Sequence, residues 1–202
     1  MKRKRRATKK NFSLIKEYKE SWKYIKESKK FIYLVTVVFL LFLLIGFFIP
    51  TPEFLYDEIM KFIRELLAKT QDMSQLDLAG FIIYNNIQST FLNVVLGIFL
   101  GIFPLFDAIA NGYMLGFVSS ISVNSNGLFS LWRILPHGIF ELPAVFISLG
   151  LGLKTGMFIF QKDKIKSFKN YLGNSLRAFL LIVIPLLIIA GIIEAMLMTL
   201  LK

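Results

Sequence analysis

Apolar residues form several long runs along this chain, and shorter charged stretches separate them. The first run, residues 31–49, contains no charged residue and is long enough to cross a bilayer core of about 30 Å. Similar runs follow it. The pattern predicts an all-α integral membrane protein with about five transmembrane helices, at about residues 31–49, 81–103, 108–123, 129–153 and 178–200.

Turn and loop signals set the expected boundaries between these spans. Pro104 and Asp107 indicate a tight turn between the second and third spans, although a re-entrant pair is an alternative for these two. Pro136 and Pro143 are expected to bend or break the fourth span. Residues 154–177, which are rich in lysine and arginine, are expected to form a basic loop.

The first 30 residues differ in character from the rest. They carry 13 Lys or Arg and three Glu. Apolar residues within them follow a helical three–four spacing, and these are Ile15, Tyr18, Trp22 and Ile25. We therefore expect residues 1–30 to form a basic tail and an amphipathic helix that rests on anionic membrane lipids, ahead of a single transmembrane domain at 31–202.

A second amphipathic helix is expected between the first two spans. Residues 51–78 contain six acidic and three basic side chains, and Thr51-Pro52-Glu53 is a favourable helix start. One apolar stripe of this helix contains Leu55, Ile59, Phe62 and Leu66. The helix either lies on the membrane surface or packs over the spans, or it offers a docking surface to an extracytoplasmic partner.

Composition and charge support this class of protein. The chain is 55% hydrophobic, with 24 Lys or Arg against 13 Asp or Glu. The basic residues concentrate at 1–30 and 154–177, which places both segments in the cytoplasm by the positive-inside rule. With five spans, the N-terminus would lie on the cytoplasmic side of the cell membrane and the C-terminus on the outer side. The same rule explains the basic excess without nucleic acid, and the absence of cysteine excludes disulfides and thiolate metal sites.

Polar residues inside the predicted spans are the candidate functional groups, because such groups are costly in a bilayer. They are Asn85, Asn86, Asn93, Asp107, Asn111, Arg133, His137, Glu141 and Glu194. On a continuous helix, Arg133, His137 and Glu141 would form a row on one face. Three explanations stay open: an internal hydrogen-bonded network, a pathway or pocket for an ion or small solute, and a membrane-embedded hydrolase. A single histidine is a poor ligand set, so no metal or cofactor is expected.

One motif, with its surroundings, resembles a known family. It contains Pro136, His137, Gly138, Glu141, Leu142 and Pro143. Together with Asn85-Asn86, Gly97, Gly101 and Asn111-Gly112, this run resembles the stage II sporulation protein M family of polytopic membrane proteins over about residues 30–200. The resemblance implies a septal membrane protein that is thought to scaffold peptidoglycan-degrading enzymes in endospore formers. Relatives also occur in bacteria and archaea that make no spores.

The leading hypothesis from the sequence is therefore a non-enzymatic membrane scaffold. It would recruit or position other membrane or envelope proteins, such as peptidoglycan-remodelling enzymes. The alternative is a channel or carrier for an ion, proton or small solute that uses the Arg133, His137 and Glu141 row, since histidine titrates near neutral pH. A homodimer would enlarge such a pathway.

Overall fold

The regular secondary structure of the described residues consists of helices without strands, as predicted. A computed structural model describes residues 13–133 and 135–200. For residues 133, 135–140 and 194–200 it describes the backbone but not the side chains. The α-helices are α1 (Leu14–Glu27), α2 (Lys29–Phe48), α3 (Glu53–Thr70), α4 (Gln75–Leu96), α5 (Ile102–Asn126), α6 (Leu135–Gly156), α7 (Lys164–Ala178) and α8 (Ile184–Leu200). Short 3₁₀ helices occupy Leu128–Arg133 and Met157–Phe160, and a π-helical turn occupies Phe179–Val183.

Four helical segments are long and apolar enough to cross a membrane. They are Lys29–Phe48, Ile102–Asn126, Glu141–Phe160 and Lys164–Ile193. Many of their outward-facing side chains are apolar; on α2, for example, Tyr33 and Val37 are more than 60% exposed. An apolar surface of this kind suits lipid rather than water. Helix α4 is not among the four, and a row of amides gives it a more polar character.

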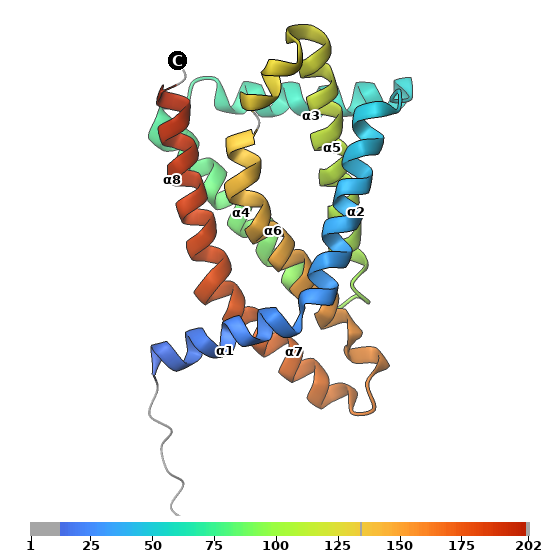
Figure 1. Ribbon diagram of the computed structural model, residues 1–202, viewed down its shortest axis with the longest axis vertical. Coiled ribbons are helices and arrows are strands. Elements are labelled where there is room, and N and C mark those ends of the chain that lie inside the picture. Colours follow the sequence, from blue (N-terminus) through green and yellow to red (C-terminus); the bar gives the residue numbers. More distant parts are fainter. Residues whose placement is uncertain (1–12, 134, 201–202) are drawn as a thin grey trace, which may run out of the picture.

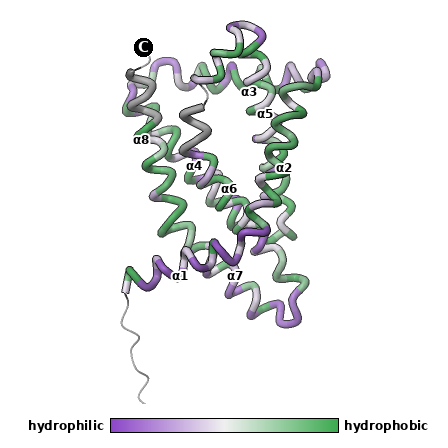
Figure 2. Tube along the Cα trace, viewed as in Figure 1, coloured by the Kyte–Doolittle hydropathy of each residue, from purple (hydrophilic) through white to green (hydrophobic). Residues whose placement is uncertain are grey.

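The amphipathic helices lie at the two ends of the apolar body. Figure 1 shows α1 and α7 at one end, whereas α3 lies across the other end, where α8 finishes. Hydrophilic residues gather on α1, α7 and α3, and hydrophobic residues fill α2 and much of α8 between them (Figure 2). Lysine is common on both α1 and α7, so one end of the molecule is basic.

Glycine residues bring α2 and α5 into close contact. A Cβ at Gly116 would lie 2.0 Å from the carbonyl oxygen of Leu43, and one at Gly112 would lie 2.4 Å from that of Phe39. From the other side, a Cβ at Gly46 would lie 2.3 Å from the Tyr113 oxygen. Small residues allow this backbone approach where apolar lipid removes the hydrophobic drive between helices. Gly112 and Gly116 therefore form a packing face of α5 that contacts α2 of the same chain.

The predicted turn between the second and third spans is misplaced. Helix α4 ends at Leu96 and α5 begins at Ile102, so the turn lies at 97–101, where Leu100 and Gly101 have positive φ angles of 57° and 71°. Pro104 and Asp107 lie inside α5. Proline is tolerated in a first helical turn because its missing N–H would have no intrahelical partner there.

The predicted fourth span, 129–153, contains two elements. Arg133 ends the 3₁₀ helix Leu128–Arg133, and α6 begins only at Leu135. Arg133 is thus assigned to the 3₁₀ helix, and its predicted row with His137 and Glu141 stays a prediction, because the side chains of Arg133 and His137 lie outside the described part. Pro143 lies inside α6 without ending it, and Pro136 lies in its first turn. Membrane helices tolerate an internal proline when neighbouring helices support the backbone.

The predicted basic loop at 154–177 is also wrong. Helix α6 continues to Gly156, and α7 occupies Lys164–Ala178. Asp163 caps α7, because its carboxylate accepts a hydrogen bond from the Lys166 amide over 3.1 Å. Three of the lysines that suggested a loop, Lys164, Lys166 and Lys169, are exposed on this amphipathic helix.

Replacing Asp163 with alanine is expected to loosen the start of α7. Loss of an N-cap costs about 0.5–2 kcal/mol of helix stability. Hydrogen–deuterium exchange of the full-length protein should therefore show faster exchange at 164–168, while α2 and α5 stay unchanged. Lys162→Ala, an exposed neighbour outside the cap, is the matched control. Equal exchange in the two variants would contradict the capping role.

Candidate functional site

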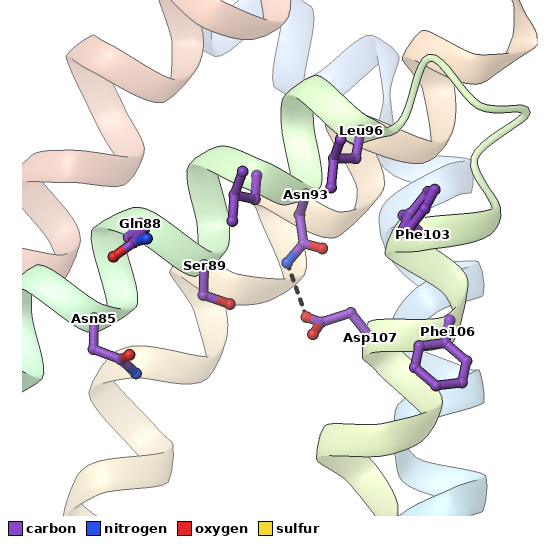
Figure 3. A pocket seen from close by; sticks show the side chains of 9 residues that line it. Asn85, Gln88, Ser89, Asn93, Leu96, Phe103, Phe106 and Asp107 are labelled. Carbon is purple, nitrogen blue, oxygen red and sulfur yellow. Dashed lines mark hydrogen bonds between the residues drawn. The ribbon is translucent and has the colours of Figure 1, made fainter.

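A polar groove lies between α4 and α5. Its volume is about 330 Å³, and its lining residues are Asn85, Gln88, Ser89, Leu92, Asn93, Leu96, Phe103, Phe106 and Asp107. Figure 3 shows the two helices diverging from the loop that joins them, with the polar side chains of α4 facing the gap. We call this feature the polar groove.

Helical periodicity produces the α4 wall of the groove. Asn85, Gln88, Ser89 and Asn93 are spaced by three or four residues, so their side chains share one face. The opposite face of α4 packs on α6 and α8, where Val94 is fully buried and Ser148 donates a hydrogen bond to the Thr90 carbonyl. The helix therefore turns its apolar side to the bundle and its amide row to α5.

A hydrogen bond joins the two walls near the loop. The Asn93 amide donates to the Asp107 carboxylate over 2.8 Å, and Asn93 is only 6% exposed (Figure 3). One turn further along α5, Asn111 donates to the Asp107 carbonyl oxygen over 3.0 Å. Asn85, Gln88 and Asn111 are exposed, so the polar surface continues from this pair along both helices.

Glycine packing fixes the loop end of the groove against α6. A Cβ at Gly152 would lie 2.1 Å from the Asn93 carbonyl, and a Cβ at Gly97 would lie 2.1 Å from the Gly152 carbonyl. The loop residue Gly101 lies against Leu153. The Asn93–Asp107 pair is thus held on a rigid junction of three helices, which is what an oriented binding group needs.

The polar groove offers one carboxylate among neutral amides and hydroxyls. These groups suit a proton, a cation or a small polar solute. The Asp107 carboxylate would balance a positive charge, and the amides would orient the ligand through hydrogen bonds. Among the residues that the structure describes, no group of three or more His, Cys, Asp or Glu side chains could hold a metal ion.

Some predicted site residues meet in the groove, and others do not. Asn85, Asn93 and Asp107 line it, with Asn111 bonded beside them. Asn86 does not line it, and its carbonyl accepts the Thr90 hydroxyl. Glu141 is a partly buried member of α6 that has an interaction partner. The side chains of four further predicted residues lie outside the described part, and these are Arg133, Pro136, His137 and Glu194.

The remaining motif positions lie on α6. Gly138 is described by its backbone alone, Leu142 is half-buried against the core, and Pro143 is exposed. Sequence reasoning missed Gln88 and Ser89, although their spacing from Asn85 places them on the same helical face. A search for polar residues three and four positions apart would have found both.

The predicted docking stripe on α3 divides into two sets. Ile59 is 7% exposed and Leu55 is half-buried, so these two pack against the rest of the chain. Phe62 and Leu66 are 54% and 39% exposed. Phe54 and Leu67 are also exposed. We refer to the four exposed apolar side chains Phe54, Phe62, Leu66 and Leu67, which come from more than one side of α3, together as the outer apolar face.

Comparison with known proteins assigns the family. The family model described as stage II sporulation protein M matches residues 35–198. The chain belongs to the stage II sporulation protein M family. This match confirms the resemblance seen in the motif around His137 and in the glycine-rich spans, and it agrees with a polytopic membrane protein.

Two similar proteins come from the archaeon Methanocaldococcus jannaschii. The chain is 29% identical to the uncharacterised protein MJ0706 over 194 residues, which cover 88% of this chain and 86% of the relative. It is 34% identical to the uncharacterised protein MJ0793 over 113 residues, which cover 51% of this chain and 64% of that relative. No solved structure matches the chain.

Proposed function

We propose that this member of the stage II sporulation protein M family is a non-enzymatic membrane scaffold that positions partner proteins through α3. The observation that carries the proposal is the outer apolar face, on a helix that lies across one end of the molecule (Figure 1). Helix α3 is held to the bundle at its start, where Tyr56 stacks on Phe117 and Tyr113 donates to Thr51. Its later turns leave apolar side chains available to a partner.

The charges around this face indicate the kind of partner. Residues 51–78 contain six acidic and three basic side chains. A partner with an apolar patch bordered by basic residues would complement this surface. The family resemblance implies envelope proteins, such as peptidoglycan-remodelling enzymes, as the class to test first.

The proposed topology puts α3 outside the cell membrane. In this proposal α2, α4, α5, α6 and α8 cross the bilayer, the N-terminus is cytoplasmic and the C-terminus is outside. The basic helices α1 and α7 lie together at one end, as the positive-inside rule favours for cytoplasmic segments. Helix α4 would cross with its amide row lining the open polar groove between α4 and α5.

Removing the outer apolar face is expected to abolish partner capture. The variant Phe62→Ser/Leu67→Ser should lower cross-linked recovery of envelope proteins at least tenfold, because central apolar contacts dominate interface energies. In-cell cross-linking followed by purification and mass spectrometry measures this loss. The matched control is Phe160→Ser/Ile165→Ser, which removes two exposed apolar side chains at the opposite end. Equal recovery with both double variants would refute the scaffold proposal.

A second function is favoured by the polar groove. A carboxylate and several amides between helices of an apolar body are the usual components of a solute or ion site. We propose a carrier or channel role as the alternative, with Asp107 in place of the Arg133, His137 and Glu141 row as its charged group. Ion and proton flux into liposomes that contain the purified protein measures this function.

A further inference from the structure

A second polar cavity lies at the opposite end from α3, where α1 and α7 meet the end of α6. Its volume is about 490 Å³, and its lining includes Glu20, Tyr24, Glu27, Lys154, Tyr171 and Arg177. This volume falls within the range of about 300–1,000 Å³ that is usual for small-molecule pockets. We call it the junction pocket; neither the scaffold proposal nor the polar groove uses it.

Lys154 lies in this pocket with few partners. The residue is 8% exposed, and its ammonium lies 3.8 Å from the centre of the Tyr24 ring. An ammonium has three N–H donors. In the described part of the chain, its hydrogen-bond acceptor is the Ser28 hydroxyl, at 3.0 Å. A buried cation with unused donors is costly unless an acceptor completes its shell.

Arg177 provides a second incompletely paired cation. Its guanidinium contacts the Glu17 carboxylate over 2.7 Å and also donates to Asn174. Its Nε is buried and has no hydrogen-bond partner among the described residues. The Lys154 ammonium and the Arg177 Nε thus have N–H donors for which further acceptor oxygens are needed. A phosphate group provides such oxygens in a geometry that lysine and arginine bind well.

The carboxylates of the pocket narrow the choice of ligand. Glu20 is half-buried and Glu27 is exposed, both on α1 beside Lys154. They would repel a simple dianion but would pair with an amine on the same molecule. The Tyr24 ring already lies against the Lys154 ammonium, and burial raises the pKa of the Tyr24 hydroxyl to about 12, so Tyr24 adds no negative charge to the pocket.

We propose that the junction pocket binds a phosphate ester that carries a primary amine, which is the chemistry of phosphoethanolamine. Lys154 and Arg177 hold the phosphate, and Glu20 and Glu27 hold the amine. Two sources provide this group, an aminophospholipid headgroup and a soluble phosphoethanolamine. The location beside the amphipathic helices α1 and α7, at the end of a membrane-capable segment, matches headgroup depth.

Native mass spectrometry of the full-length protein tests the proposal. Protein is extracted from liposomes with equal parts of phosphatidylethanolamine, phosphatidylcholine and phosphatidylglycerol, and the retained lipids are counted. We expect preferential retention of phosphatidylethanolamine, and at least a tenfold loss of it in Lys154→Met. Lys166→Met, which removes an exposed α7 lysine, should bind like the wild type. Arg177→Gln tests the same pocket if Lys154→Met fails to fold.

Titration with O-phosphoethanolamine separates the two sources. Saturable binding of this soluble compound that Lys154→Met abolishes, without selective retention of phosphatidylethanolamine, assigns the pocket to a soluble ligand. Selective lipid retention assigns it to a headgroup. Equal retention of phosphatidylglycerol and phosphatidylethanolamine, together with no saturable binding of O-phosphoethanolamine, overturns the proposal, since Glu20 and Glu27 would then select no amine. If neither Lys154→Met nor Arg177→Gln changes the binding of the lipid or of O-phosphoethanolamine, the proposal is overturned as well.

Discussion

Gly116→Ala is expected to destabilise the protein strongly and to lower its folded yield. The new Cβ would lie 2.0 Å from the Leu43 carbonyl oxygen and 2.9 Å from the Phe47 amide nitrogen. Both contacts are with backbone, which no side-chain rotation relieves. Helices α2 and α5 would have to separate along their shared face, and overpacking of this kind costs about 1–3 kcal/mol. Unfolding in mixed detergent micelles and size-exclusion profiles measure the loss.

Gly173→Ala is the matched control for this prediction. A Cβ at Gly173, in the middle of α7, meets nothing within 4 Å. Because glycine inside a helix is less stable than alanine by about 0.5–1 kcal/mol, this change should leave stability unchanged or raise it slightly. Similar unfolding midpoints for the two variants would show that the close α2–α5 approach does not stabilise the fold.

The long apolar runs were sufficient to predict most of the helical body. The expected first span at 31–49 corresponds to α2 at Lys29–Phe48, because an uninterrupted apolar run next to Pro50 leaves little choice of boundary. The glycines at 112 and 116 are four residues apart, which places both on the side of α5 that packs on α2. The apolar run and the glycine spacing are both local patterns that can be read from the sequence without the fold.

The predictions were wrong where a loop was inferred from charge and a turn was inferred from proline. Lysines at 154–177 suggested a loop, but an amphipathic helix places lysines on one side equally well, and Asp163 was the overlooked start signal. Pro104 suggested a turn, although a first helical turn accepts proline. The actual turn at 97–101 depends on contacts of Gly97 and Gly101 with α6, which no local pattern reveals.

Some of the site residues could be predicted from local chemistry, whereas the contacts between them depend on the fold. The cost of amides and carboxylates in a bilayer pointed to Asn85, Asn93 and Asp107, which the fold brings to one groove. The pairing of Asn93 with Asp107 follows from the turn that precedes α5, so a misplaced turn concealed it. Lys154 was assigned to a loop for the same reason, and its burial between α1 and α7 became visible only with the fold.

Asp107→Asn separates the two proposed functions of the chain. The substitution keeps the size of the side chain and an acceptor oxygen for the Asn93 amide, so we expect stability to change by less than about 1 kcal/mol. It removes the negative charge of the polar groove. If the groove carries protons or cations, flux into proteoliposomes should fall at least tenfold while partner capture by α3 stays intact. A pH-gradient assay with a fluorescent dye, and a parallel potassium flux assay, measure it.

Two further variants make the flux result decisive. Asp72→Asn removes an exposed carboxylate between α3 and α4 and should leave flux unchanged. Glu141→Ala tests the alternative site on α6, so loss of flux there with retention in Asp107→Asn would move the pathway from the polar groove to α6. Absence of flux in the wild type at every pH and voltage would leave the Asn93–Asp107 bond as internal packing. The scaffold proposal would then stand alone, because the exposed side chains of α3 do not depend on the groove.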